Sequence, residues 1–144
     1  MAEMTLSDIA GRMKDIDFCM LTSKSADGQL STRPMSNNRD VEYDGDSWFF
    51  AYEDAGFVGD IARDAAVGLS FSGAKSLLGK PGIFIAVAGE ATVIRDRGTF
   101  AEHWVDDLER WFPQGVETPG MVMIKVRARH LHYWDGEDEG EVAL

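Results

Sequence analysis

The fold of this chain is indicated by residues 18–36, which read FCMLTSKSADGQLSTRPMS. A short apolar stretch, Phe18–Ser23, is followed by Ala26-Asp27-Gly28 and then by a second stretch from Gln29 to Ser36. Asp-Gly pairs are typical of tight hairpin turns, because such turns need residues that tolerate positive φ. We therefore predict an antiparallel hairpin here. Pro34 has no backbone N–H to donate, so the second strand is expected at an edge, at a bulge or beside a ligand.

Further elements are predicted on both sides of this hairpin. Thr5 precedes an amphipathic stretch and has Asp8 three residues later, which is typical of a helix start, so a helix is expected over 5–16. Asp44-Gly45-Asp46 predicts a second hairpin turn, and Gly89 predicts a bulge inside a strand. The remaining expected elements are strands at 47–52, 66–72, 83–95 and 121–134, a helix from an Asp54 cap to about Arg63, and a two-piece helix at 98–112.

Six or seven strands joined mostly by short turns, with three short helices, predict a mainly β fold: an antiparallel β-barrel with peripheral helices. The chain has no Gly-x-Gly-x-x-Gly after a strand and no Gly-Lys-Ser/Thr loop, which argues against a dinucleotide-binding Rossmann fold or an NTPase. One domain over 1–144 is expected, and its acidic end, residues 135–144, is expected to be a loosely ordered tail.

The charge and composition of the chain limit the kinds of partner that it is expected to bind. The chain has 144 residues and a formal net charge of −11. A surface this acidic repels phosphate backbones and anionic headgroups, so neither nucleic acid nor a membrane is an expected partner. The longest apolar run, Ile83–Ala88, is far too short to cross a bilayer. Without a signal-like segment and with one cysteine, Cys19, a cytoplasmic location is expected.

The histidines, the cysteine and the serines of this chain do not by themselves predict a metal site or a catalytic site. His130 and His132 share a strand face and His103 is a third imidazole, but no carboxylate or cysteine completes a known metal spacing, so no metal site is predicted. Cys19 lies in an apolar strand and is expected to be buried and inert. No Gly-x-Ser-x-Gly motif and no Ser-His-Asp order is present, and no catalytic acid or base can be named.

An ordered series of short motifs points to a family. The chain resembles the general stress protein 26 group of the pyridoxamine 5′-phosphate oxidase-like, FMN-binding split-barrel superfamily over about residues 5–136. The residues that carry this resemblance are Met20-Leu21-Thr22, Asp27-Gly28, Thr32-Arg33-Pro34-Met35, Trp48-Phe49-Phe50, Leu69-Ser70-Phe71, Gly89-Glu90-Ala91, Trp111-Phe112-Pro113 and Tyr133-Trp134-Asp135. The resemblance implies a six-stranded split barrel that forms a homodimer, with two flavins bound between the subunits.

The resemblance also assigns site residues. Arg33, Pro34 and Met35 would lie along the flavin, with Arg33 helping to hold it, and Phe49, Phe50 and Ala51 would run beside its ring and ribityl chain. Trp111 would lie near the cleft, and Trp134 would reach the flavin of the partner subunit. Plainer interpretations stay open: Arg33 as a surface arginine, Trp111 and residues 48–50 as core, and Trp134 as an interface anchor without a ligand. FMN is expected, and FAD is not excluded.

One departure from the group concerns the flavin phosphate. The group usually has Ser-x-Lys at the start of the helix after the Trp-Phe-Phe strand, whereas this chain has Ala55-Gly56-Phe57. Charge-assisted contacts of this kind stabilise by roughly 1.5–3 kcal/mol each, so weak FMN binding is expected. Three functions therefore stay open: a flavin-dependent oxidoreductase, a non-catalytic flavin or small-ligand binder, and a dimeric barrel that has lost its cofactor. Pyridoxamine phosphate oxidation itself is disfavoured, because residues 135–139 are acidic where a substrate phosphate would need cations.

Overall fold

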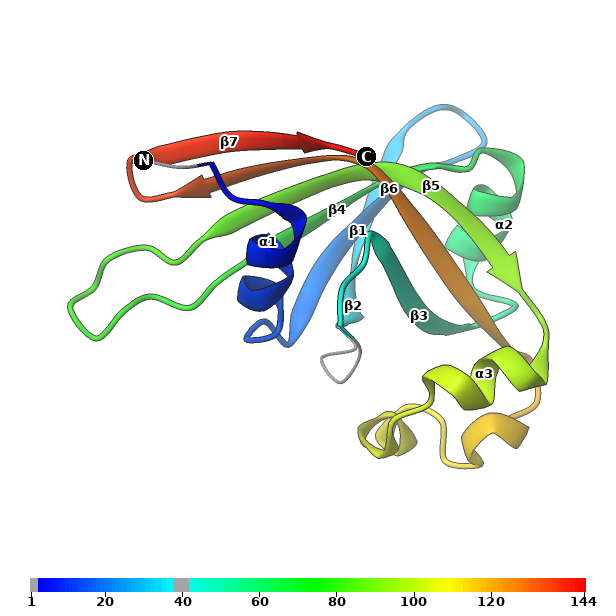
Figure 1. Cartoon of the computed structure of the whole chain (residues 1–144). Helices are drawn as coiled ribbons and strands as arrows, with labels where there is room; N and C mark the ends of the chain where they lie inside the picture. Colours follow the sequence, from blue (N-terminus) through cyan, green and yellow to red (C-terminus); the bar gives the residue numbers. More distant parts are fainter. Residues whose placement is uncertain (1–2, 38–41) are drawn as a thin grey trace.

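The computed structural model describes residues 3–37 and 42–144 (Figure 1). Within these residues seven antiparallel strands form one curved sheet, in the order β2-β1-β4-β5-β6-β3, with β7 paired to β6. Three short α-helices lie at its ends, as predicted. The strands are β1 (Phe18–Lys24), β2 (Leu30–Ser36), β3 (Asp46–Tyr52), β4 (Ala66–Ser72), β5 (Phe84–Ile94), β6 (Met121–Asp135) and β7 (Asp138–Ala143).

Strand β6 joins the two halves of the sheet. It pairs with β5 along nearly its whole length, with β3 through its first half and with β7 through its last residues. The register of β5 against β6 shifts between Ala88 and Gly89, which confirms the predicted bulge. A Cβ at Gly89 would collide with the Arg127 carbonyl oxygen, so only glycine allows this close approach of the two backbones. The bulge lets the long strands bend around the core.

The barrel remains split between β2 and β3. The first predicted hairpin is present, since β1 and β2 pair across a turn in which Gly28 has φ 81°. The second predicted hairpin is wrong: Gly45 makes a turn with φ 110°, but no pairing among the described residues joins β2 to β3. An Asp-Gly pair specifies a turn and not the partner of the strand that follows. The apolar partners for β3 come from β6, where Phe49 lies opposite Ile124.

The main core fills the barrel and is closed by two helices. Helix α1 (Leu6–Met13) buries Ile9, Ala10 and Met13, and helix α2 (Gly56–Arg63) buries Val58 and Ile61. The predicted start of α1 is confirmed by a capping box in which Thr5 and Asp8 each accept a hydrogen bond from the other's backbone N–H.

The predicted Asp54 cap of α2 is wrong. The cap residue is Ala55, and it makes no side-chain cap bond. The Ala55 N–H donates to the Tyr52 carbonyl, so a tight turn separates β3 from the helix and shifts its start by one residue.

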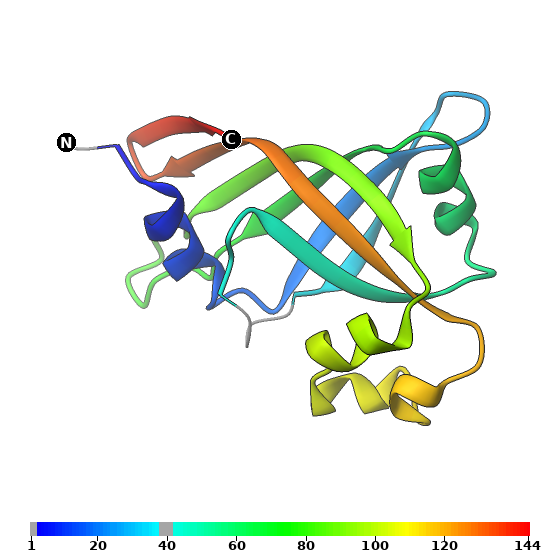
Figure 2. The same cartoon turned by 45° about the vertical axis from the view of Figure 1, so that its right-hand side comes forward.

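The helical segments that follow β5 lie outside the barrel (Figure 2), and a second apolar cluster packs between them and the sheet. The segments are α3 (Arg97–His103) and the 3₁₀ turns η1 (Asp106–Arg110) and η2 (Gly115–Glu117), which bear out a helix in pieces. Met123 alternates along β6 with the residues that face the barrel core, and this second cluster buries it completely. The buried members of the cluster are Phe100, Leu108, Phe112, Met121 and Met123.

The acidic C-terminal segment is not a loose tail. Residues 138–143 form β7 against β6. Glu139 and Glu141 find partners on the neighbouring strand: Glu139 Oε1 lies 2.9 Å from His132 Nε2, and Glu141 Oε1 lies 3.3 Å from His132 Nδ1. The sequence interpretation treated the carboxylates as solvated and overlooked these imidazoles. Among the helices of the described chain, none is long and apolar enough to cross a bilayer.

Candidate functional site

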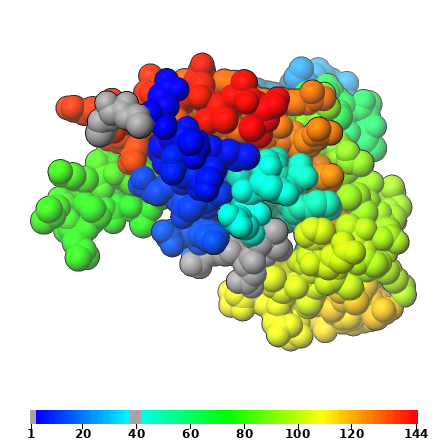
Figure 3. Space-filling view, in the orientation of Figure 1, coloured from blue at the N-terminus to red at the C-terminus, as the bar shows by residue number. Residues whose placement is uncertain are grey.

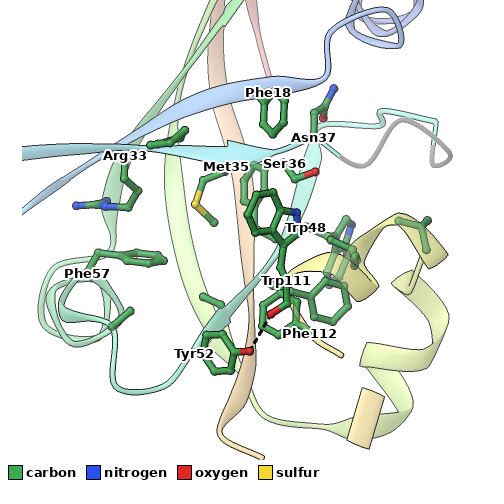
Figure 4. Close-up of a pocket in the computed structure, with 17 residues that line it drawn as sticks. Phe18, Arg33, Met35, Ser36, Asn37, Trp48, Tyr52, Phe57, Trp111 and Phe112 are labelled. Atoms are coloured by element: carbon green, nitrogen blue, oxygen red, sulfur yellow. Dashed lines mark hydrogen bonds between the residues drawn. The ribbon is translucent and has the colours of Figure 1, made fainter. Parts of the chain in front are cut away.

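A cavity of about 420 Å³ occupies the split between β2 and β3 (Figure 4). Its walls are largely aromatic and aliphatic, and among the described residues that line it only Arg33 carries a charge. Such a cavity suits a flat, mainly apolar ligand with a few polar groups. The lining residues are Phe18, Arg33, Pro34, Met35, Ser36, Asn37, Trp48, Phe49, Phe50, Ala51, Tyr52, Ala55, Phe57, Val105, Leu108, Trp111 and Phe112.

The structure brings together seven of the eight residues assigned from sequence. Three come from β2, three from β3, and Trp111 follows η1; all seven line the cavity. Trp134 does not line it: this side chain lies near the end of β6 and stacks on His132, with ring centroids 4.0 Å apart and planes at 8°. Its assigned role in a partner subunit stays a prediction.

Other lining residues were missed by the sequence interpretation. Ser36 and Asn37 directly continue the Arg-Pro-Met strand, and Tyr52 continues the Trp-Phe-Phe strand, so their positions carried a signal. Val105 and Leu108 carried none, because their segment reaches the cavity only through tertiary packing. The Tyr52 hydroxyl donates to the Trp111 carbonyl oxygen over 2.8 Å and so ties this segment to β3.

Arg33 is held in place at one end of the cavity. Its Nη1 donates to Ser23 Oγ at 3.1 Å and to the Leu21 carbonyl at 3.4 Å, and its Nη2 donates to Ser31 Oγ at 2.8 Å. Partial burial lowers the pKa of Arg33, while the negative charge of Asp60 acts to raise it. A guanidinium still remains protonated at neutral pH. The structure therefore disagrees with a plain surface arginine.

The start of α2 lies at the same end of the cavity. The guanidinium carbon of Arg33 lies 4.5 Å from the centroid of the Phe57 ring, which is a cation–π contact. Figure 4 shows both side chains on one side of the cavity, opposite Trp111 and Asn37. The ring of Phe57 therefore contacts Arg33 at the position where the resemblance to the general stress protein 26 group implies a lysine.

The cysteine and the histidines lie outside this cavity. Cys19 is buried, as predicted, and this burial raises the pKa of its thiol to about 12. His103 stacks on Trp48 with centroids 3.8 Å apart. His130 and His132 lie on β6 opposite β7, where Glu139 and Glu141 approach them. The three imidazoles therefore do not gather at one place.

Comparison with known proteins agrees with this architecture. A sequence model of proteins described as pyridoxamine 5′-phosphate oxidase like matches residues 5–144. The chain belongs to this family.

Among individual proteins, the chain is similar to protein bli-3 of Neurospora crassa. The two are 25% identical over 140 residues, which cover 91% of this chain and 65% of the relative, so the chain spans about two-thirds of that protein.

Solved structures show the same split barrel. A protein related to general stress protein 26 from Clostridium acetobutylicum superposes with a TM-score of 0.79 at 14% identity, covering 96% of this chain and 94% of the other. A pyridoxamine 5′-phosphate oxidase-related, FMN-binding protein from Nostoc punctiforme gives a TM-score of 0.69 at 12% identity, covering 94% of each chain. Identities this low speak for the fold alone.

Proposed function

We propose that this chain binds FMN in the cavity between β2 and β3 and acts as a flavin-dependent oxidoreductase of the general stress protein type. The observation that carries the proposal is the cavity itself, which is lined by seven of the eight residues assigned from the family resemblance. Membership of the pyridoxamine 5′-phosphate oxidase-like family supports it. So does the FMN-binding protein of the same fold from Nostoc punctiforme.

The residues present fit the parts of a flavin unequally. Met35, Phe50 and Trp111 offer apolar surface to an isoalloxazine ring. At the α2 end, Ala55 and Phe57 supply neither a hydroxyl nor an ammonium to a phosphate. Arg33 is the cation there, and its Nη atoms already donate to serine hydroxyls and a carbonyl. We therefore expect FMN to bind, but weakly.

The roles of the protein groups follow from their positions. A bound flavin supplies hydride or electron transfer, and the protein supplies position and electrostatics. The aromatic wall would orient the ring and exclude water, and the positive charge of Arg33 would favour the anionic end of the ligand. The described lining residues include no carboxylate and no imidazole. An acid–base step by the protein is therefore not part of the proposal.

We further propose that the chain is a homodimer. The outer face of the sheet supports this, because Met20, Ser70 and Ala86 lie opposite one another across β1, β4 and β5 without a charge. Phe84 and Trp134 pair beside them, 46% and 38% exposed. The row that contains Ala86 continues to His132 on β6 and Glu141 on β7, so the uncharged part of the face is the patch on β1, β4 and β5. This patch is a suitable contact for two chains that each carry −11. Light scattering is expected to give twice the chain mass of 15.9 kDa.

A second candidate is favoured by one contact. The stacking of Arg33 on Phe57 uses the cation at the phosphate end and places a ring there. This favours a dimeric barrel that has given up FMN, or one that binds a small ligand without a phosphate. A non-catalytic flavin binder lies between the two.

The test begins with the purified protein. Oxidised flavin absorbs visible light, and mass spectrometry of the heat-released ligand distinguishes FMN, FAD and riboflavin. The stripped protein is then titrated with FMN and with riboflavin, and flavin fluorescence is followed. Quenching by FMN at micromolar concentrations supports the proposal. A folded protein that quenches neither ligand contradicts it and supports the cofactor-free barrel.

A further inference from the structure

Helix α2 borders the end of the cavity at which Arg33 lies. Figures 1 and 3 show this helix at the surface of the molecule, beside the β1–β2 hairpin. Phe57, in the first turn of α2, contacts Arg33. Asp60 follows Phe57 by three residues, and residues at this spacing lie on the same face of a helix. The face of α2 that meets Arg33 therefore carries a carboxylate as well as an aromatic ring.

The negative charge of Asp60 acts on Arg33. It raises the pKa of Arg33, against the lowering effect of burial. The Asp60 carboxylate is held in place by Arg63, whose Nη2 lies 2.8 Å from Asp60 Oδ1. The side chain of Asp60 is 20% exposed and that of Arg63 is 49% exposed, so the carboxylate is the charge that solvent screens less. A sheltered carboxylate near the charged lining residue lowers the positive potential that a ligand meets there.

The guanidinium of Arg33 is already engaged by neutral partners. Ser23 is a buried serine, 1% exposed, and its hydroxyl accepts a hydrogen bond from Arg33 Nη1 at 3.1 Å. Ser31 Oγ accepts one from Nη2 at 2.8 Å. Strong binding of a phosphate by arginine uses two parallel N–H groups at once. Because each terminal nitrogen already donates to a serine, Arg33 is better suited to single hydrogen bonds with neutral oxygens than to a bidentate phosphate contact.

The other charges around α2 do not supply a second cation for a ligand. Residues 53–64 contain four carboxylates and one basic side chain, Arg63, which is paired with Asp60. Arg95 approaches from the end of β5, but its Nε lies 2.9 Å from Glu53 Oε1. The uncapped backbone N–H groups at the start of α2 act in the opposite direction, since helix N-termini attract anions. A phosphate at this end therefore meets attraction and repulsion together.

We propose that Asp60 determines which flavin the cavity prefers, and that riboflavin binds at least as tightly as FMN. The rings of the two ligands contact the same apolar walls, so their affinities differ through the phosphate alone. Arg33 attracts this group and Asp60 repels it, and the two effects offset each other. The ribityl hydroxyls, which both ligands carry, are the neutral oxygens that accept from Arg33. The inference rests on the proposed flavin-binding function and deepens it, because it names the form of flavin that the site selects.

Titration of the stripped protein with riboflavin and with FMN tests this preference. For the wild type, the dissociation constant for riboflavin is expected to be no larger than that for FMN. Asp60→Asn should tighten FMN binding at least about fivefold at low salt and leave riboflavin unchanged, because a unit charge is removed beside a dianion. High salt should reduce this gain by screening the charges. Asp60→Glu keeps the charge and should behave as the wild type. Tighter binding of FMN than of riboflavin by the wild type would overturn the proposal.

Two control variants separate the charge of Asp60 from its other effects. Arg63→Gln breaks the same ion pair from the other side, and it should not tighten FMN binding because it removes a positive charge. Glu137→Gln removes one carboxylate from the turn between β6 and β7, at the opposite end of the molecule from α2 (Figure 1, Figure 2), and reports the effect of net charge alone. A gain in either control equal to that of Asp60→Asn would overturn the proposal, as would an equal gain for both flavins.

A pair of fluorescent dyes decides the role of Asp60 without any flavin. Anilinonaphthalenesulfonate and phenylnaphthylamine have the same rings, but only the first carries a negative charge. Asp60→Asn should tighten the sulfonate alone, and Arg33→Ala should weaken it. If the wild type binds the dyes but neither flavin, the proposed function fails and the dyes decide the role of Asp60. If FMN binds and Asp60→Asn leaves its affinity unchanged, this inference is overturned alone. A cavity that takes neither dye nor flavin overturns both.

Discussion

Helices α1 and α2 have the same length and lay the same kind of apolar face on one core, yet they begin differently. The start of α1 is closed by its own side chains, through the reciprocal bonds of Thr5 and Asp8. The start of α2 has Ala55 at the cap position and no side-chain bond. The start of the first helix is therefore capped within the chain. The second begins without a side-chain cap at the edge of the cavity, at the end where we propose that the ligand phosphate binds.

The largest effect, on FMN affinity, is expected from placing at the start of α2 the serine and the lysine that the family resemblance implies there. Ala55→Ser/Phe57→Lys should tighten FMN binding by at least about tenfold, because two polar or charged contacts to the phosphate are restored at roughly 1–3 kcal/mol each. The measurement is a fluorescence titration with FMN beside a thermal melt. Riboflavin, which lacks the phosphate, is the control ligand and should gain nothing.

A different result with the same variant would mean that the uncapped start of α2 has no role in binding FMN. If Phe57 serves mainly as packing for Arg33 and the core, lysine at this position lowers the melting temperature and adds no affinity. That result would favour the barrel without FMN.

Removing the cation beside α2 should have the next largest effect. Arg33→Ala is expected to weaken FMN binding by about tenfold or more, because a charge-assisted contact contributes roughly 1.5–3 kcal/mol. The matched control is Arg63→Ala, which removes an equal charge from the last turn of α2, where Arg63 pairs with Asp60 at 2.8 Å. An equal loss in both variants would mean that net charge, and not the position of Arg33, attracts the ligand.

Substitutions at the two cap positions test how much a side-chain cap contributes to the stability of each helix. Thr5→Ala should lower the free energy of unfolding by about 1 kcal/mol, the usual effect of losing a side-chain cap. Ala55→Ser, measured without ligand, should raise it by a few tenths to about 1 kcal/mol. Urea denaturation gives both values. If Thr5→Ala leaves the free energy of unfolding unchanged, the packing of Ile9 and Met13 alone stabilises α1.

The smallest expected effect is a pH dependence confined to α1. Hydrogen bonds from the backbone and the side chain of Thr5 hold the pKa of Asp8 below its ordinary value of 3.8. A carboxylate with a lowered folded-state pKa stabilises above its unfolded pKa, and this is lost as the pH falls through the folded value. The stability difference between wild type and Asp8→Asn should therefore be present at pH 7 and shrink below about pH 4. Asp54→Asn is the control for the loss of one carboxylate, since no cap bond of α2 uses that side chain.

The sequence predicted the fold where local chemistry determines it. The Asp27-Gly28 turn, the Thr5–Asp8 cap and the bulge at Gly89 each depend on residues close together in the chain, and all three are present. One local prediction, the Asp54 cap of α2, is wrong because a tight turn after β3 shifts the helix start. The other errors concern pairing between distant segments. The turn at Gly45 gave no sign that β3 would pair with β6, and the acidic residues of β7 gave none that His132 would lie opposite them.

The candidate site divides in the same way. Residues of β2 and β3 were assigned because their motifs are contiguous in the sequence, and they line the cavity. Val105 and Leu108 approach it only because an aromatic cluster around Phe112 places their segment there. Trp134 lies outside the cavity of its own chain, and its assigned role at a second subunit stays a prediction.

The place of β6 in the sheet also has a consequence for synthesis on the ribosome. Strand β3 carries Trp48, Phe49 and Phe50, and its backbone partner is residues 121–127. These aromatic residues emerge early and wait unpaired until nearly the whole chain has been made. Pairing across so long a stretch makes folding slow and leaves intermediates open to aggregation. We expect a nascent chain that ends before residue 121 to need a chaperone, and release of β6 to be the event that commits the barrel to close.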